Sequence, residues 1–218
     1  MTDRLTTGRY PGYDVTSKRN TPSWNDKTRE VIDARLAVAS RPEFLSSEEW
    51  LTLVALCDRV MPQPEGRPRV PLAAYVDRQL LAGKTKGYRF ADMPQPAEAW
   101  KRALAALDEV ARREKGRPFA QLTQGDQDAM LHRMAAGSFD AEALKGMPAS
   151  TFWTSHVIHD VIGSYYAHPE AWNEMGWGGP ASPRGYVRLG LDARDSWEPV
   201  EAAPGGDDKA RQENKRVR

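Results

Sequence analysis

Apolar side chains recur with a helical period along most of this 218-residue chain, and proline or glycine separates each periodic run from the next. No stretch keeps the period-two alternation of a half-buried strand for long enough to form a sheet. The sequence therefore predicts an all-α fold, arranged as a single orthogonal multi-helix domain. Helices are expected over residues 26–39, 46–61, 71–83, 96–115, 123–137 and 148–166.

The clearest helix boundary is at Ser46. Ser46 and Glu49 have the spacing of a capping box, in which each side chain accepts a hydrogen bond from the other residue's backbone N–H. Pro62 and Pro64 end the same run because proline has no backbone N–H to donate. The run over 148–166 is apolar on nearly every side, which indicates a central helix wrapped by the others.

Three regions follow from these runs. Residues 1–25 form a long aromatic N-terminal arm, and residues 26–200 form the helical domain. Within that domain, residues 168–197 are rich in glycine, proline and tryptophan and have no helical period, so an ordered C-terminal loop is expected. Residues 201–218 are polar and are expected to form a disordered tail, because so few apolar groups do not offset the entropy lost on ordering.

The charge balance and the single cysteine exclude several classes of function. Lys and Arg number 31 against 30 for Asp and Glu, so no basic excess is present to bind a nucleic acid. Cys57 alone forms no internal disulfide, thiolate zinc site or iron–sulfur cluster, and its position in an apolar stripe predicts burial. No run reaches the roughly 18 apolar residues that a membrane helix needs.

No motif for a nucleotide cofactor or a nucleophilic serine is present. The patterns GxGxxG, GxxxxGK[ST] and GxSxG are missing, and the glycines at 176–179 neither follow a strand nor open a helix. His156, His159 and Asp160 have a spacing that can bring two imidazoles onto one metal ion, but no third and fourth ligand is evident. Packed, hydrogen-bonded histidines are therefore favoured. The chain is predicted to have no catalytic residue, cofactor or metal of its own, with a stand-alone metal-dependent enzyme as the alternative.

Aromatic side chains gather in the two regions without helical periodicity. Such segments bury little ring surface by themselves, so either the arm and the loop fold back on the chain's own helices or a second polypeptide covers them. We favour the second polypeptide, because aromatic and arginine side chains are enriched at the centres of protein interfaces. The predicted interface residues are Tyr13, Trp24, His168, Trp172, Trp177, Arg184, Tyr186 and Trp197.

Five short stretches, taken in order and spacing, resemble one protein family. They are ALCDRVMP at 55–62, YVDRQL at 75–80, FAQL at 119–122, YYAHP at 165–169 and GWGGP at 176–180. Over roughly residues 44–197 the chain resembles the small subunit, subunit 3, of gluconate 2-dehydrogenase. It is similar in the same way to the small subunits of flavin-dependent glucose, fructose and glucoside 3-dehydrogenases.

The resemblance implies a non-catalytic subunit that binds, stabilises or helps to mature a large subunit of the glucose-methanol-choline (GMC) oxidoreductase type. In such a complex the large subunit holds FAD and the catalytic base and oxidises a sugar or polyol. Electrons then leave through a cytochrome or an iron–sulfur subunit. A transient chaperone that departs after maturation is the alternative. Residues 176–186 look like a subgroup variant, which leaves the sugar substrate open.

The N-terminus bears on the expected compartment. Many members of this family carry a twin-arginine export signal on the small subunit, and residues 1–9 of this chain show neither paired arginines nor an apolar stretch. Lack of the apolar core of a secretory signal predicts a cytoplasmic protein. Export to the periplasm together with a signal-bearing partner is the alternative.

Overall fold

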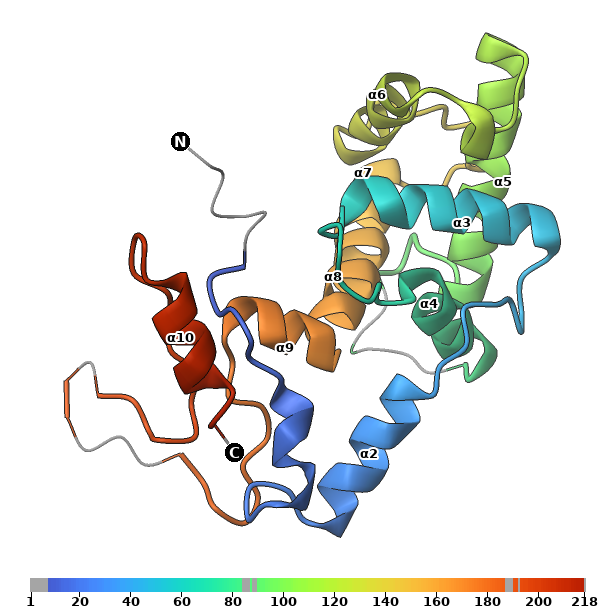
Figure 1. Cartoon of the computed structure of the whole chain (residues 1–218). Coiled ribbons are helices and arrows are strands. Elements are labelled where there is room, and N and C mark those ends of the chain that lie inside the picture. The colour runs from blue at the N-terminus through green and yellow to red at the C-terminus, as the bar shows by residue number, and fades with distance from the viewer. Residues whose placement is uncertain (1–7, 84–86, 88–89, 187–189, 192, 218) are drawn as a thin grey trace. The chain divides into compact units, whose positions relative to one another are not determined.

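The all-α prediction is confirmed by a computed structural model, which describes residues 8–83, 87, 90–186, 190–191 and 193–217. Every regular element within these residues is a helix, apart from one isolated bridge between Trp24 and Ser182 (Figure 1). The chain falls into two compact units, which are taken in turn below. Unit 1 contains Met1–Val38, Pro64–Val70 and Tyr166–Arg218, and unit 2 contains Ala39–Gln63 and Pro71–Tyr165.

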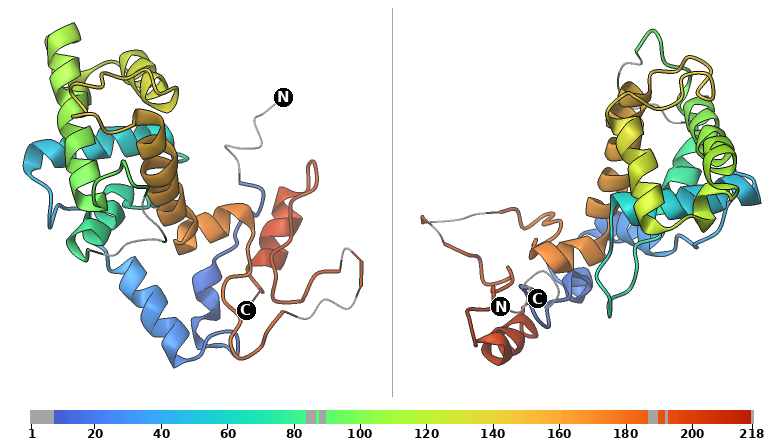
Figure 2. Two further views of the ribbon diagram at one scale, coloured as in Figure 1. Left: turned by 180° about the vertical axis from the view of Figure 1, so that it is seen from behind. Right: turned by 90° about the horizontal axis from the view of Figure 1, so that it is seen from above.

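Unit 2 is a bundle in which α3 packs against α4, α5 and α6. Figure 2 shows this group of helices from two further directions. Its interior is filled by large apolar side chains that include Leu56 of α3, Trp100 of α5 and Phe152 of α7. The elements are α3 (Ser47–Val60), α4 (Leu72–Leu81), α5 (Pro96–Lys115), η2 (Phe119–Gln121), α6 (Gln124–Ala135), α7 (Ala149–Phe152), η3 (Trp153–Ile158) and α8 (His159–Tyr166), whose last residue is grouped with unit 1.

The predicted boundary at Ser46 is confirmed. The Ser46 Oγ accepts a hydrogen bond from the Glu49 N–H at 3.2 Å, and the Glu49 carboxylate accepts one from the Ser46 N–H at 2.9 Å. A second local signal is at the C-terminal end of the long helix α5. There Gly116 adopts the left-handed conformation, with φ of 72°, that terminates a helix without strain from a side chain. Local sequence signals therefore place these two helix ends.

The predicted helix over 148–166 is interrupted by one stretch of π-helix, η3. Hydroxyl groups at its start compete for backbone carbonyls: the Thr154 Oγ1 donates to the Ser150 carbonyl at 3.0 Å, and the Ser155 Oγ donates to the Thr151 carbonyl. Such back-bonding loosens the regular ladder of an α-helix, and a π turn is one way to accommodate it. Hydrophobic periodicity does not report this local widening.

A buried carboxylate organises the entry to α3. Asp77 of α4 is fully buried, and its two oxygens accept hydrogen bonds from the backbone N–H groups of Glu43 at 2.7 Å, Phe44 at 3.0 Å and Leu45 at 2.8 Å. Backbone donors aimed at one carboxylate form strong, charge-assisted bonds. Asp77 therefore holds the segment that leads into the capping box.

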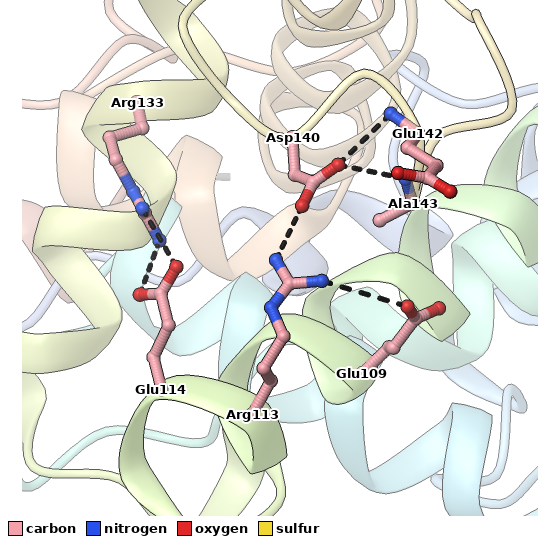
Figure 3. A network of polar contacts seen from close by, with 7 residues as sticks. All are labelled: Glu109, Arg113, Glu114, Arg133, Asp140, Glu142 and Ala143. Carbon is pink, nitrogen blue, oxygen red and sulfur yellow. Dashed lines mark hydrogen bonds and ion pairs between the residues drawn. The ribbon is translucent and has the colours of Figure 1, made fainter.

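Ion pairs join α5 to α6 and to the loop that follows it (Figure 3). Arg133 makes two hydrogen bonds with Glu114, at 2.9 and 3.0 Å. Arg113 pairs with Asp140, whose carboxylate also accepts hydrogen bonds from the backbone N–H groups of Glu142 and Ala143. The hydrogen bond from Ala143, followed by the one from Arg113, lowers the pKa of Asp140 below its ordinary value. The loop is thus held by a charged side chain.

Unit 1 brings together segments from both ends of the chain. The side chain of Asn25 caps α2 by accepting a hydrogen bond from the Thr28 N–H. The helical elements of unit 1 are η1 (Val15–Asn20), α2 (Asp26–Leu36), α9 (Pro169–Met175) and α10 (Asp207–Asn214). Predicted regions 1–25, 26–200 and 201–218 do not coincide with these groupings, because unit 1 draws on all three.

Helices α9 and α10 and the short 3₁₀-helix η1 lie where the sequence predicted no helix. Helix α9 begins with a cap, because the His168 Nδ1 accepts from the Glu170 N–H at 3.2 Å, and Pro169 and Gly176 stand at its two ends. It is too short, at seven residues, to show a period. Helix α10 lies in the segment expected to be disordered, and it is held by tertiary hydrogen bonds of Asn214.

Candidate functional site

The aromatic residues of the arm and of the C-terminal loop form the core of unit 1. Rings from the two regions without helical periodicity pack there against one another and against Ile32 of α2. The buried members of this ring cluster are Tyr13, Val15, Trp24, Ile32, Trp172 and Val217, and Tyr10 packs against it. The arm and the loop therefore fold back on this chain, which is the arrangement that the sequence analysis had ranked second.

Trp172 of α9 is one of the two tryptophans in the ring cluster. Its ring meets that of Trp177 edge to face, with centroids 4.7 Å apart at 90°. Its Nε1–H donates to the Tyr166 carbonyl at 2.7 Å, so the one polar group of the ring is satisfied. The guanidinium of Arg35 lies 5.8 Å from the ring centroid and donates to the Ala167 carbonyl at 2.8 Å. Trp172 thus fixes α9 to both flanking segments.

The glycines at 176–179 are required by close packing. A Cβ built on Gly176 would lie 2.2 Å from the ring of Tyr10, one on Gly178 would lie 2.8 Å from Trp197, and one on Gly179 would lie 2.5 Å from Val15. Real Cβ atoms do not approach other atoms so closely. Because each glycine has no side chain, a side chain from another segment packs directly against its backbone: Tyr10 at Gly176, Trp197 at Gly178 and Val15 at Gly179.

Replacing Gly176 with alanine is expected to destabilise unit 1 by more than the same change at Gly205. Both have positive φ, 70° and 74°, but nothing lies within 4 Å of a Cβ at Gly205. Backbone strain alone costs about 1 kcal/mol at either position, and overpacking against Tyr10 adds about 1–3 kcal/mol at Gly176. Urea-unfolding midpoints, followed by tryptophan fluorescence, measure the difference. Equal shifts in the two variants would show that Tyr10 does not press on Gly176.

Lys18 is a buried cation inside this packing. Its Nζ donates to the Tyr13 hydroxyl and to the Gly178 carbonyl, both at 2.8 Å. It also lies 5.1 Å from the ring centroid of Tyr13 and 5.0 Å from that of Trp197, where cation–π attraction offsets part of the lost hydration. Lys18 thereby joins three segments that are far apart in the sequence.

Burial changes the acid–base behaviour of this group. Desolvation, reinforced by the nearby charge of Arg184 and opposed by Glu198, lowers the pKa of Lys18 to about 8. Burial raises the pKa of Tyr13 well above its ordinary value, so its phenol stays protonated and donates to the Trp177 carbonyl at 3.1 Å. At neutral pH the pair is therefore a charged amine and a neutral phenol.

The predicted interface residues all lie in unit 1, but they divide into two groups. Five of them are buried inside the chain itself: Tyr13, Trp24, His168, Trp172 and Trp197. Trp177 is 39% exposed, Tyr186 is 42% exposed, and Arg184 is partly exposed. These last three residues form what we call the exposed aromatic face.

The exposed aromatic face is supported from below by buried groups. Tyr186 packs on Trp197 with ring centroids 4.6 Å apart, and its hydroxyl donates to the Gly179 carbonyl. The guanidinium of Arg184 lies over the ring of Trp197, 5.3 Å from its centroid. Trp177 rests edge to face on Trp172. These side chains are consequently held in defined positions while part of each stays in contact with solvent.

His168 has a structural role. Burial, with a smaller contribution from the charge of Arg35, lowers its pKa to about 4. The imidazole is therefore neutral at pH 7, which leaves Nδ1 free to accept the hydrogen bond that caps α9. Sequence analysis did not single out this cap, although the order His-Pro-Glu at 168–170 is a signal for a helix start.

The alternative metal site is not assembled as the spacing suggested. The Nδ1 atoms of His156 and His159 lie 4.0 and 3.8 Å from the carboxylate of Asp160, which accepts a hydrogen bond from the Trp100 Nε1–H at 2.9 Å. Within residues 8–83, 87, 90–186, 190–191 and 193–217, no group of three or more His, Cys, Asp or Glu side chains could hold a metal ion. Asp160 therefore serves to anchor Trp100.

Two further sequence predictions bear on the helices. Cys57 is buried as predicted, and desolvation raises the pKa of its thiol far above the ordinary value, so it is a packed, unreactive group. Among the helices of the described residues, none combines the length and the apolar character needed to cross a membrane.

Lys18 and Asn214 are buried polar residues that were not predicted from the sequence, because neither belongs to a recognisable motif.

Comparison with known proteins gives one match. The family model described as gluconate 2-dehydrogenase subunit 3 matches residues 47–179, which is more than half of the chain. The search of curated proteins and the search of solved structures each return no match. The matched region runs from the start of α3 to the glycines after α9, and it excludes the N-terminal arm and the segment after residue 179.

Proposed function

This chain belongs to the gluconate 2-dehydrogenase subunit 3 family, and from that membership we propose that it is the non-catalytic small subunit of an FAD-dependent sugar or polyol dehydrogenase. Its partner is a large subunit of the GMC type, which holds FAD and the catalytic base. A cytochrome or an iron–sulfur subunit takes the electrons onward. The observation that carries the proposal is the family match over residues 47–179.

We further propose that the exposed aromatic face binds the large subunit. Trp177, Tyr186 and Arg184 are of the residue types that dominate binding energy at protein interfaces. They are also positioned in advance by Trp172 and Trp197, so little side-chain entropy is lost when a partner covers them. Two buried members of the original set, Trp172 and Trp197, support this face.

Co-expression with the large subunit tests the proposal. The double variant Trp177→Ala/Tyr186→Ala is expected to raise the Kd for the large subunit by about 30-fold or more, because one interface anchor is worth about 2 kcal/mol. Leu191→Ala is the matched control, since it also removes a large apolar side chain from the same loop. Leu191 is 98% exposed, so buried residues do not hold it in position as they hold Trp177 and Tyr186. The circular dichroism of each variant confirms that unit 1 stays folded.

The outcomes separate the parts of the proposal. Unchanged affinity in the double variant removes the exposed aromatic face from the interface. Failure of the wild-type chain to co-purify with any flavoprotein contradicts the assignment as a subunit. If the chain is needed for maturation yet is absent from the active peak in size-exclusion chromatography, it acts as a departing chaperone.

A further inference from the structure

The C-terminal segment of unit 1 is fastened to the N-terminal segment by one buried side chain. Asn214 is 2% exposed. Its Nδ2 donates to the carbonyls of Pro11 and Val200, both at 3.0 Å, and its Oδ1 accepts from the Val200 N–H at 2.7 Å. This amide therefore ties the end of α10 both to its own preceding loop and to the N-terminal arm, as the position of α10 beside the blue N-terminal segment shows (Figure 1).

Other polar contacts between the two segments lie nearer the surface. Arg9 makes a two-pronged ion pair with Glu201, at 2.9 and 3.0 Å, and the Ala202 N–H donates to the Arg9 carbonyl at 2.9 Å. The Ser17 hydroxyl donates to the Val217 carbonyl at 3.1 Å. Exposed ion pairs contribute little to stability. The buried hydrogen bond from Asn214 to Pro11 is therefore the best shielded of the polar contacts between the two segments.

The apolar attachment of α10 is small. Of its eight residues, DDKARQEN, only Ala210 and Asn214 are buried, and beyond the helix only Val217 reaches the ring cluster. An isolated helix of this length is unstable in water. Its folding therefore depends on docking against the N-terminal segment, and the docked state has a lower opening free energy than a helix such as α5, which buries Trp100, Leu104 and Leu107.

Both segments also lie outside the region matched by the family model, which ends at residue 179. Residues of both segments, Tyr13, Val15 and Val217, pack in one cluster with Trp172, which the matched region contributes. The position of these two segments therefore controls whether the ring of Trp172 is exposed to solvent.

We propose that residues 200–217 form a strap, latched by Asn214, that opens together with residues 9–17 while unit 2 stays folded. Opening withdraws Tyr13, Val15 and Val217 from the ring cluster and exposes Trp172, and closing rebuilds the cluster. This conformational device belongs to the chain itself and does not depend on the identity of the large subunit.

Hydrogen–deuterium exchange of the full chain, read by mass spectrometry, tests the strap. In the wild type, residues 9–17 and 200–217 are expected to exchange with one common opening free energy, and at least about 100-fold faster than the central turns of α5. Asn214→Ala is expected to speed exchange in both segments by at least about tenfold, because it removes three hydrogen bonds. Exchange in α5 should be unchanged.

Asn25→Ala is the matched control, because it removes an asparagine hydrogen bond of unit 1 that caps α2 and does not touch the strap. If Asn214→Ala does not fold, Asn214→Asp replaces it, because aspartate keeps the size and the Oδ acceptor but loses both Nδ2 donors. The exchange rates of the two segments and of α5 in the wild type test the proposal without any variant. The proposal is overturned if the two segments exchange independently, if they are as protected as α5, or if only residues 200–217 respond. Binding to the large subunit is a separate measurement, so failure of one proposal is distinguishable from failure of the other.

Discussion

Asp77→Ala is expected to lower the free energy of unfolding of unit 2 by about 4 kcal/mol, one of the two largest single-residue effects in the molecule. The change removes the acceptor of three backbone N–H groups, those of Glu43, Phe44 and Leu45. The Leu45 N–H is left buried without a partner, which adds a desolvation cost to the lost bonds. A urea titration followed by circular dichroism at 222 nm measures the change in midpoint.

Asp77→Asn separates the charge of this group from its shape. The amide keeps one acceptor oxygen, but its NH₂ faces N–H groups that it repels, so about half of the destabilisation is expected to remain. Asp92→Ala is the control, because Asp92 is exposed in the same unit and its removal should cost no more than about 0.5 kcal/mol. If Asp77→Ala melts like this control, the carboxylate does not organise the segment before α3.

Trp172→Ala is expected to unfold unit 1 selectively, at a cost of about 3–5 kcal/mol. The truncation empties the centre of the ring cluster, leaves the Tyr166 carbonyl without its donor and removes the support under Trp177. Limited proteolysis should then cut the terminal segments first, while the fragment that contains α3 to α8 resists. Loss of near-ultraviolet circular dichroism with retained far-ultraviolet signal is the second expected result.

Two variants show what part of Trp172 matters. Trp172→Phe keeps a ring but removes the Nε1–H bond at 2.7 Å, so a cost of about 1–2 kcal/mol is expected. Leu191→Ala removes a large apolar side chain that is 98% exposed, and it should leave the proteolysis pattern unchanged. Wild-type protease resistance of the terminal segments in Trp172→Ala would be incompatible with a central role for this ring.

The predicted interface shows how burial alters a sequence-based interpretation. Aromatic residues in segments without helical periodicity indicate a surface that a partner covers, and eight residues are predicted to form that interface. In the structure five of them are buried within unit 1, three of these five in the ring cluster, and only Trp177, Tyr186 and Arg184 keep substantial exposed surface. Residue type alone does not distinguish a ring that packs in its own chain from one that waits for a partner, because both positions favour the same side chains.

Family membership and the helical fold were accessible from the sequence, and so were most helix boundaries. The capping box at Ser46, the helix over Pro96–Lys115 and the terminator at Gly116 are local signals, because each depends on residues within four positions of one another. The short helix α9, the π turn η3 and the order of residues 201–217 were not predicted. Those features arise from competition or docking that periodicity does not record.

The amino-acid sequence by itself determined the ends of the longer helices such as α3 and α5, and it carries the short motifs that indicate the family. These features depend on neighbours along the chain. Only the tertiary structure decided the rest. The Lys18 bond to Gly178 joins residues 160 positions apart, and the Asn214 bond to Pro11 joins residues 203 positions apart. A polar side chain becomes buried and stabilising only when distant backbone groups converge on it, and no local pattern encodes that convergence.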